Sequence, residues 1–370
     1  MFALKKFKVA AVQAAPIFLN RSASVEKACR IIREAGAEGA RIIGFPEGFI
    51  PAHPHWFHFE PAINRRAMEF NTQLWNNALE VPSPEAGALC DAAKQAGAYV
   101  VMGCCERLPG GSGSLYNSQL FIGPNGEVLG KHQKLVPTHA ERVVHAQGQR
   151  KHGIVCVPTE LGGSLGGLIC GEHFNTLARF ALIAKGELFH VGSWPANFAA
   201  GHHQMMFEAK NFSGRAHAFE GKLFVINAAG VVSEEIKQIL CPDPGREDVF
   251  GSMGGGSAII GPDGNYIAGP ARDKEEILYG EFDLSNIVRG KVLHDICGHY
   301  QRPDIFTLIL NEEDPQLILD SSTQEGRKSS EMLRLENKAH QRSAAVAEGS
   351  NSDFLMSSSE KGRIRSPEGK

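Results

Sequence analysis

Short apolar runs alternate with segments of helical spacing at the start of the chain. Residues 7–14 (FKVAAVQA) predict a buried strand, because apolar side chains fill a run of strand length. Apolar positions then recur every three or four residues from Val25 to Ala35, after the N-cap candidate Ser24, and predict a helix. Residues 41–45 predict a second strand. A strand, a helix and a strand in this order predict a right-handed parallel crossover.

The same kind of unit repeats further along the chain. Ser83 and Pro84 predict the start of a helix, because serine caps helices and proline is most at home at the first helical position. A buried strand is predicted at 98–106. Residues 115–132 alternate on both sides of a Pro-Asn-Gly turn, residues 256–269 do the same around Pro-Asp-Gly, and both patterns predict hairpins.

Strands and helices also alternate between the two hairpins. Helices, parallel runs and hairpins are therefore interleaved, which predicts an α/β fold with mixed sheets covered by helices. The elements predicted in this part are a strand ending at Cys170, a helix at about 174–185, a strand at 187–193, a long helix at about 201–219 and a strand at 222–228.

The pattern changes at about Pro315. Residues 315–370 contain 11 serines and one aromatic residue, and their only long apolar period is a short helical pattern at 331–346. Such a segment cannot bury enough apolar surface to offset the entropy lost on ordering. We therefore expect one folded domain over residues 1–314 and a mostly disordered tail over residues 315–370.

Composition and charge narrow the class of function. The chain has 38 Lys and Arg against 41 Asp and Glu, a net charge of −3, and 42% hydrophobic residues, as in an ordinary globular protein. This balance lacks the basic excess of a nucleic-acid binder. No apolar run approaches the roughly 18–20 residues of a membrane helix, and the first residues lack a signal-peptide pattern. We expect a cytoplasmic protein without nucleic-acid or membrane partners.

Cysteine and histidine spacing does not indicate a metal site. The eight cysteines are interpreted as reduced thiols, because the chain is long and carries no secretion signal. Neither a CxxC pair nor an HExxH motif occurs. The two histidine clusters, His53/His55/His58 and His202/His203, lack the cysteine or carboxylate neighbours of a zinc motif. No metal is expected.

Three reactive side chains each stand where a predicted buried strand ends. They are Glu47, Lys134 and Cys170, and strand ends are where ligands and catalytic groups gather in α/β sheets. A thiol becomes a good nucleophile only as a thiolate, so it needs a base or a nearby cation. Glu47 can take the proton and Lys134 can hold the developing negative charge. The three residues therefore indicate a cysteine nucleophile that requires no histidine.

These residues lie in three ordered motifs. Glu47 lies in GFPEGF, Lys134 in HQKLVPTHAER and Cys170 in GLICGEH. Over residues 7 to about 310 the chain thereby resembles the nitrilase branch of the carbon-nitrogen hydrolase superfamily. The segments FIPAHPHWF and HDICGHYQRPDIF resemble true nitrilases more than amidases. The resemblance implies a four-layer α-β-β-α sandwich, no cofactor, no metal, and homodimers that build larger, often helical, oligomers.

The resemblance also implies an activity, the hydrolysis of an organic nitrile to a carboxylic acid and ammonia. Cys170 would add to the nitrile carbon and form a thioimidate. Lys134 and the backbone N–H of Gly171 would stabilise the nitrogen as charge builds. Glu47 would act as acid and then as base. Glu141 would keep the lysine charged and correctly aimed, as the family's second glutamate does.

Further candidates for contact with the substrate lie beside these residues. They are Trp56, Thr138, His173 and Trp194, and the resemblance implies that the loop after Trp194 lies by the pocket. Gly171 departs from the family pattern, because nitrilases usually carry a tryptophan directly after the nucleophile. A missing indole leaves room for a bulkier substrate, and a looser backbone amide favours an amide by-product.

Other functions stay open at this point. An amidase or carbamoylase needs the same glutamate, lysine and cysteine, and a cyanide-degrading enzyme is a further alternative. A catalytically silent interaction protein on the same fold is also conceivable, because fold does not dictate function. The presence of the complete catalytic set argues against a protein without catalytic activity. This set is Glu47, Lys134, Glu141 and Cys170. The sequence does not distinguish aliphatic, aryl and arylacetonitrile substrates.

Overall fold

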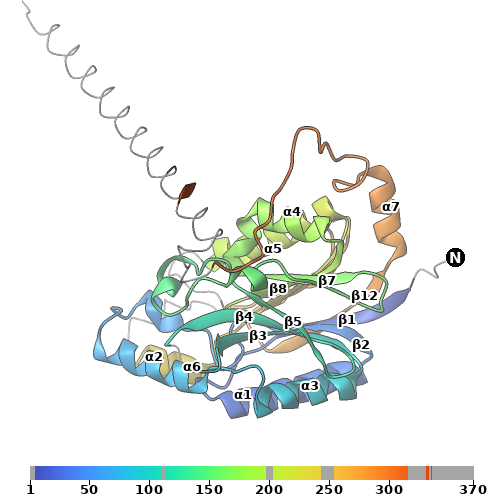
Figure 1. The fold of residues 1–370 in the computed structure, drawn as a ribbon. Helices are drawn as coiled ribbons and strands as arrows, with labels where there is room; N and C mark the ends of the chain where they lie inside the picture. The colour runs from blue at the N-terminus through green and yellow to red at the C-terminus, as the bar shows by residue number, and fades with distance from the viewer. Residues whose placement is uncertain are drawn as a thin grey trace, which may run out of the picture. The chain divides into compact units, whose positions relative to one another are not determined.

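A computed structural model gives the course of most of the chain (Figure 1). Contacts divide the chain into two units, residues 1–313 and 314–370. His202 and most of the predicted tail lie outside the described residues. The disorder of the tail therefore stays a prediction. The structure describes residues 5–110, 113–196, 203–242 and 254–315, together with Glu331, Met332 and Leu335.

Two mixed sheets of six strands each form the centre of the first unit. In spatial order, the first sheet contains β12 (Glu276–Asp283), β1 (Lys6–Gln13), β2 (Ala40–Gly44), β3 (Tyr99–Arg107), β4 (Leu115–Ile122) and β5 (Val128–Gln133). The second contains β11 (Tyr266–Ala268), β10 (Ala258–Ile260), β9 (Phe224–Ala229), β8 (Glu187–Trp194), β7 (Ser164–Ile169) and β6 (Cys156–Pro158). The central strands β1, β2 and β3, and likewise β7, β8 and β9, run parallel, and the outer strands pair antiparallel.

Helices cover the outer face of each sheet. The first sheet carries α1 (Arg21–Ala37) and α3 (Pro84–Ala96), and the second carries α4 (Thr176–Ala184) and α5 (His203–Gly221), as Figure 1 shows. The predicted four-layer α-β-β-α sandwich is therefore confirmed. The remaining helical segments are α2 (Arg65–Asn77), α6 (Glu234–Leu240), α7 (Ser285–Leu293), and the short 3₁₀ helices η1 (His55–His58), η2 (His139–Val143), η3 (Arg150–His152) and η4 (Cys170–Phe174).

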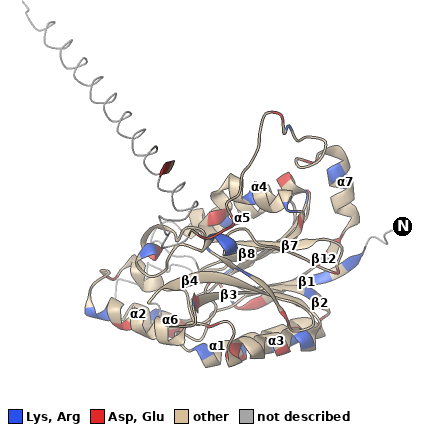
Figure 2. Cartoon of the chain, in the orientation of Figure 1, with Lys and Arg blue, Asp and Glu red and all other residues tan. Residues whose placement is uncertain are grey.

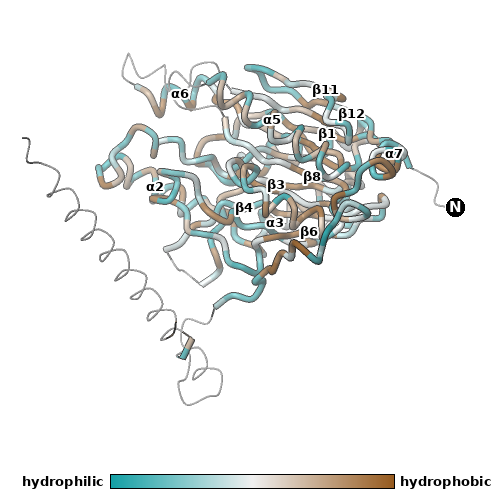
Figure 3. The backbone as a smooth tube through the Cα atoms, turned by 90° about the horizontal axis from the view of Figure 1, so that it is seen from above, coloured by the Kyte–Doolittle hydropathy of each residue, from teal (hydrophilic) through white to brown (hydrophobic). Residues whose placement is uncertain are grey.

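The layer between the sheets is apolar and closely packed. Phe224 of β9 stacks on Phe282 of β12 with ring centroids 4.1 Å apart, and Phe189 of β8 stacks on the same ring at 6.1 Å. All three rings are completely buried. Burying one such side chain contributes about 1.5–3 kcal/mol, so these contacts hold the two sheets together. Seen from above, hydrophobic stretches lie on strands in the middle of the view and also on parts of helices such as α6 and α7 (Figure 3).

One predicted helix start is wrong and another is confirmed. The N-cap of α1 is Asn20, and Ser24 lies inside the first turn. The Ser24 hydroxyl donates to the carbonyl of Ile17 at 2.9 Å and accepts from the same residue's N–H at 3.1 Å, so it fixes the segment that enters the helix. Ser83 caps α3, with Pro84 in the first turn, as predicted.

Charged residues of both signs are spread over the helices and strand ends (Figure 2). Some of them join neighbouring elements: Arg21 of α1 forms an ion pair with Glu85 of α3 at 2.8 Å. Among the described residues, no helix has both the length and the hydropathy that crossing a membrane requires.

Candidate active site

The three predicted residues follow strands of both sheets and meet at one place. Glu47 follows β2, Lys134 follows β5 and Cys170 follows β7. The Lys134 ammonium donates to Glu47 Oε1 at 2.9 Å, and both charges influence the pKa of the Cys170 thiol. At most 5% of each residue is exposed. The structure therefore joins groups that are far apart in the sequence into one buried cluster.

The segment that carries Glu47 passes very close to β3. A Cβ atom at Gly103 would lie only 1.9 Å from the carbonyl oxygen of Pro46, so glycine is required there. The backbone N–H of Glu47 donates to the carbonyl of Trp194 at 3.2 Å, at the end of β8. The glutamate is thereby held between the two sheets.

Glu47, Lys134, Glu141 and Asn117 form a closed ring of hydrogen bonds, called the polar ring below. Lys134 donates to Glu47 at 2.9 Å and to Glu141 at 2.6 Å. The Asn117 amide also donates to both carboxylates, at 2.6 and 2.7 Å. An ammonium has three protons, so one of those on Lys134 is left for a ligand. Glu47 Oε1 accepts twice, whereas no described residue hydrogen-bonds to Oε2.

Burial and charge set the protonation of this cluster. Burial raises the pKa of Glu47 to about 7, although Lys134 acts in the opposite direction. Burial also opposes ionisation of Glu141, but Lys134 outweighs it and holds the pKa of this carboxyl below its usual range. The carboxylates likewise overcome burial at Lys134 and raise its pKa. Burial, reinforced by Glu47, raises the pKa of Cys170 to about 12. Near neutral pH the Cys170 thiol is therefore protonated and Glu47 is partly ionised, so the glutamate can accept the thiol proton.

Cys170 adopts an unusual backbone conformation at the start of η4. Its φ is +51°, in the left-handed region that non-glycine residues rarely occupy. Such a residue costs about 1–3 kcal/mol and persists only where its surroundings impose it. Glu172 supplies one such constraint, because its carboxylate accepts from the backbone N–H groups of Ile169 at 2.7 Å and of Leu135 at 2.6 Å. This glutamate ties the lysine segment to the cysteine segment.

Four residues of the site were not predicted. Lys210 of α5 is 1% exposed and donates to the carbonyl of Gly255 at 2.8 Å, and burial lowers its pKa to about 8 although Cys170 acts in the opposite direction. A run of polar residues, NSQ, in the first half of the predicted hairpin over residues 115–132 signals Asn117. The other three carry no comparable signal in the sequence. The four are Asn117, His145, Glu172 and Lys210.

Thr138 and Gly171 lie against each other beside the cluster. The Thr138 N–H donates to Glu141 at 2.8 Å. A Cβ atom at Gly171 would lie 3.0 Å from Thr138 Oγ1, which is a tight contact. The φ of Gly171 lies outside the left-handed region, so space and not backbone conformation restricts this position.

The remaining candidates, His173, Trp194 and Trp56, are all buried, each 1% exposed. The His173 ring stacks on Trp194 with centroids 4.6 Å apart. Trp56 is 1% exposed and packs against Phe18 and Phe70 in an aromatic cluster. Whether these residues contact the substrate stays a prediction.

Two of the clustered histidines lie beside Glu47. The rings of His53 and His55 are 4.6 Å apart, and His53 Nδ1 lies 3.5 Å from Glu47 Oε1. Burial lowers the pKa of both, that of His55 to about 3, so these rings stay neutral. With Pro46 and Phe49 they line a cavity of about 20 Å³, the size of a single water molecule.

Known proteins resemble this chain over most of its length. The family model described as carbon-nitrogen hydrolase matches residues 8–291. The chain is 37% identical to an aliphatic nitrilase of Rhodococcus rhodochrous over 309 residues, which is 83% of each chain. It is 36% identical to a nitrilase of Pseudomonas syringae pv. syringae over 323 residues, which is 85% of this chain and 92% of the relative.

Solved structures share the fold at much lower identity. Nit3 of Saccharomyces cerevisiae superposes with a TM-score of 0.62 at 18% identity, covering 80% of this chain and 97% of Nit3. A carbon-nitrogen hydrolase from Helicobacter pylori G27 gives 0.61 at 17% identity, covering 78% and 93%. The family match and the curated relatives confirm the resemblance that the motifs predict: the chain belongs to the nitrilase branch of the carbon-nitrogen hydrolase family, whose members hydrolyse carbon–nitrogen bonds.

Proposed function

We propose that the protein hydrolyses an organic nitrile to the carboxylic acid and ammonia, with Cys170 as the nucleophile. The pairing of Glu47 with the buried thiol carries this proposal. The glutamate has a pKa near 7, and no described residue hydrogen-bonds to its Oε2. The names of the relatives, which include an aliphatic nitrilase, support nitriles as the substrate class.

The first half of the reaction forms a covalent thioimidate. Glu47 Oε2 accepts the thiol proton as Cys170 Sγ bonds to the nitrile carbon. The developing negative charge on nitrogen is stabilised by the third proton of Lys134 and by the N–H of Gly171. Glu47 then returns its proton to that nitrogen.

The second half consumes two water molecules. Glu47 takes a proton from the first water, which attacks the thioimidate carbon, and returns this proton to the nitrogen. The resulting tetrahedral adduct expels ammonia as its hydroxyl proton passes through Glu47 to the leaving nitrogen and a thioester carbonyl forms. A second water hydrolyses the remaining thioester, releases the acid and restores the thiol. Glu141 keeps Lys134 charged throughout. No cofactor or metal takes part in this proposed sequence.

The same residues also suit an amidase or carbamoylase, so the substrate must be tested directly. We expect ammonia release from several nitriles of a panel covering aliphatic, aryl and arylacetonitrile compounds and cyanide. Each organic nitrile is paired with its own amide as a control, and ammonia is measured over time. Turnover of the amides alone would contradict the proposal and favour an amidase.

Gly171 is proposed to set both substrate range and product. We expect Gly171→Trp to lose bulky, α-substituted nitriles in favour of slim ones, and to release less amide from any shared substrate. The adduct partitions between loss of ammonia and loss of thiolate, and about 1.4 kcal/mol between these barriers changes the product ratio tenfold. Chromatography of acid and amide measures the ratio.

The contact with Thr138 dictates the control for this variant. Because Thr138 Oγ1 would lie 3.0 Å from the new Cβ, Gly171→Trp is also made in a Thr138→Ala background. The backbone N–H that binds Glu141 remains in that background. Unchanged substrate ranges and product ratios in both backgrounds would show that the position is neutral.

Self-association to dimers and larger helical oligomers is also proposed. Apolar side chains are exposed on the outer helices of the second sheet, including Leu177 of α4 at 62% and Phe212 of α5 at 73%. Burying such a surface between copies is favourable. We expect light scattering at micromolar concentration to give a mass well above the 40.1 kDa of one chain. A monomer would contradict this expectation.

A cytoplasmic location is proposed as well. Cys104 and Cys105 are adjacent on β3 and both are free thiols. Free thiols are typical of a reducing compartment.

A further inference from the structure

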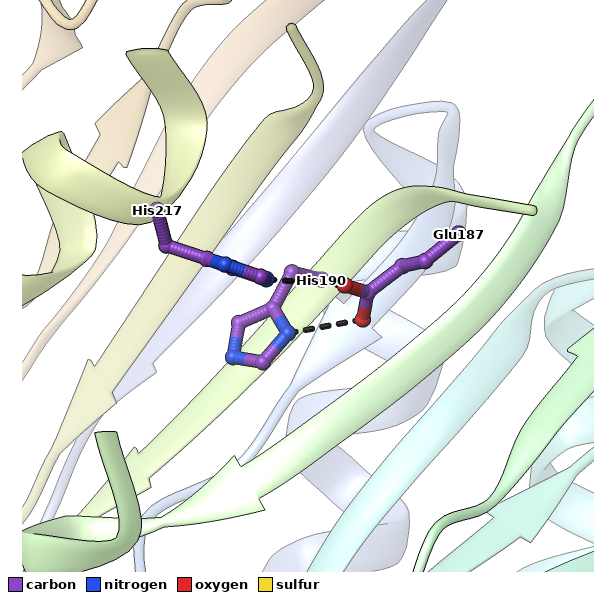
Figure 4. Close-up of side chains that lie close together, drawn as sticks. All are labelled: Glu187, His190 and His217. Carbon is purple, nitrogen blue, oxygen red and sulfur yellow. Dashed lines mark hydrogen bonds and ion pairs between the residues drawn. The ribbon is translucent and has the colours of Figure 1, made fainter. Parts of the chain in front are cut away.

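A line of hydrogen bonds runs from the carbonyl of Cys170 through the second sheet to α5. His173 Nδ1 lies 2.7 Å from that carbonyl oxygen, and His173 Nε2 lies 2.9 Å from His190 Nε2. His190 Nδ1 lies 2.7 Å from one oxygen of Glu187, and His217 Nε2 lies 2.8 Å from the other (Figure 4). These four side chains are called the histidine chain: His173, His190, Glu187 and His217.

The fold makes room for the histidine chain in its interior. Each member is at most 1% exposed. A Cβ atom at Gly192 would lie 2.9 Å from His173 Nε2, and one at Gly166 would lie 2.2 Å from Glu187 Oε1. Two glycines on adjacent strands therefore leave the space that the polar side chains fill. Burying polar atoms costs free energy of folding unless each atom has a hydrogen-bond partner.

The number of protons on the two central histidines follows from their partners. The outer nitrogens must both donate, because one faces a carbonyl oxygen and the other a carboxylate. The two inner nitrogens face each other, so one of them donates and the other accepts. His173 and His190 together thus hold three protons and one positive charge. Glu187 balances that charge within the histidine chain.

The surroundings of each ring support this assignment. Burial would raise the pKa of Glu187, but His190 and His217 lower it to about 2, so the glutamate is ionised. Burial holds the pKa of His173 well below its usual range. The positive charge therefore lies on His190, next to the carboxylate. His173 is neutral, and both of its nitrogens are occupied, so it cannot exchange a proton with substrate.

Three members of the histidine chain could also bind a metal ion instead of sharing protons. Glu187, His190 and His217 offer ligand atoms within 4.8 Å of one another. The Glu187 oxygens lie 2.7 Å from His190 Nδ1 and 2.8 Å from His217 Nε2, which are hydrogen-bond distances. Two ligand atoms of a tetrahedral zinc ion, each about 2.0–2.1 Å from the metal, would lie about 3.3 Å apart. The distances therefore favour shared protons over a metal.

We propose that the histidine chain positions the nucleophile by holding the Cys170 carbonyl and so keeping this residue in its left-handed conformation. The bond from His173 is strengthened because its ring accepts from a charged neighbour. Stacking of His173 on Trp194 couples the same turn to the end of β8, where Glu47 is anchored. The inference rests on the proposed role of Cys170. The members of the histidine chain are positioning residues, since they act through the peptide of the nucleophile.

A matched pair of variants at Glu187 tests this role. Glu187→Gln can keep every hydrogen bond while both charges of the pair are lost, because its amide donates to His190 Nδ1, which then carries no proton, and its oxygen accepts from His217. Glu187→Leu breaks both bonds. We expect Glu187→Gln to retain kcat within about threefold and Glu187→Leu to lose about ten- to a hundredfold, with KM little changed in both. Equal losses in the two variants would overturn the proposal.

Alkylation of Cys170 by iodoacetamide separates positioning from stability. The rate is measured well below the melting temperature of each variant and should fall in Glu187→Leu in parallel with kcat. A lower melting temperature with unchanged alkylation and kcat would indicate a structural role and overturn the proposal. Because this readout needs no nitrile, it remains informative even if the proposed substrate class is wrong.

The unaltered protein provides a test that does not depend on folding of a variant. Nitrogen-15 NMR of histidine-labelled protein should show a buried ring with both nitrogens protonated whose signal disappears in Glu187→Gln, whereas the signal of His132, which lies 2.8 Å from Glu172, should not change. Elemental analysis should show no stoichiometric metal. The absence of a doubly protonated ring that depends on Glu187, or an equimolar metal ion, would overturn the assignment.

Discussion

Replacing Cys170 with alanine is expected to abolish ammonia release from every nitrile while the protein stays folded. A methyl group cannot form the covalent thioimidate on which both halves of the reaction depend. Loss of one buried sulfur atom costs only about 1–2 kcal/mol, because little volume is removed. Ammonia release and thermal unfolding, followed by circular dichroism, measure the two effects.

Another buried cysteine provides the matched control. Cys104 lies on β3, is 1% exposed, and packs in the core between the first sheet and its helices. Cys104→Ala should cost similar stability and leave turnover nearly unchanged. Ammonia release above trace level by Cys170→Ala would place the nucleophile elsewhere.

The fold could largely be predicted because its signals are local. The central strands are mostly apolar runs, and Cys170 directly follows one of them. Glu47 lies three residues after β2, whereas Lys134 follows the outer strand β5, which ends in the polar residues KHQ. Their meeting place follows from the fold that the motif resemblance implies. The start of α1 was misassigned because Asn20 and Ser24 are both good capping residues, and only the packing of the preceding segment decides between them.

Apart from Glu141, the supporting groups of the site could not be predicted, because their partners are distant in the sequence. Asn117 bridges Glu47 and Glu141, which are 70 and 24 residues away. Glu187 resembles an ordinary polar strand start, yet it binds His217 on another element 30 residues later. Sequence spacing contains no information on such pairs until the sheets are assembled. The reactive groups and Glu141 could thus be predicted, whereas the other residues that set their protonation and orientation could not.

The polar ring makes Lys134 the second residue whose loss should nearly abolish activity. In Lys134→Met the methionine keeps most of the volume, but the carboxylates of Glu47 and Glu141 lose the cation between them. The nitrile nitrogen also loses a charged donor, and removal of one such donor costs about 10²–10³ in kcat. We expect kcat/KM to fall by about a thousandfold. Lys134→Arg should also be nearly inactive, because its longer planar fork does not fit the same position.

Loss of this lysine should also change the pH dependence of the thiol. Glu47 must be ionised to accept the Cys170 proton, so alkylation should rise with pH through about 7 in the unaltered protein. Lys134 lowers the pKa of Glu47, and its removal should therefore move this rise to higher pH. Lys131→Met is the control, because Lys131 pairs with the buried Glu106 outside the polar ring. A pH profile that is unchanged in Lys134→Met, or shifted equally in the control, would show that the lysine does not set the protonation of the base.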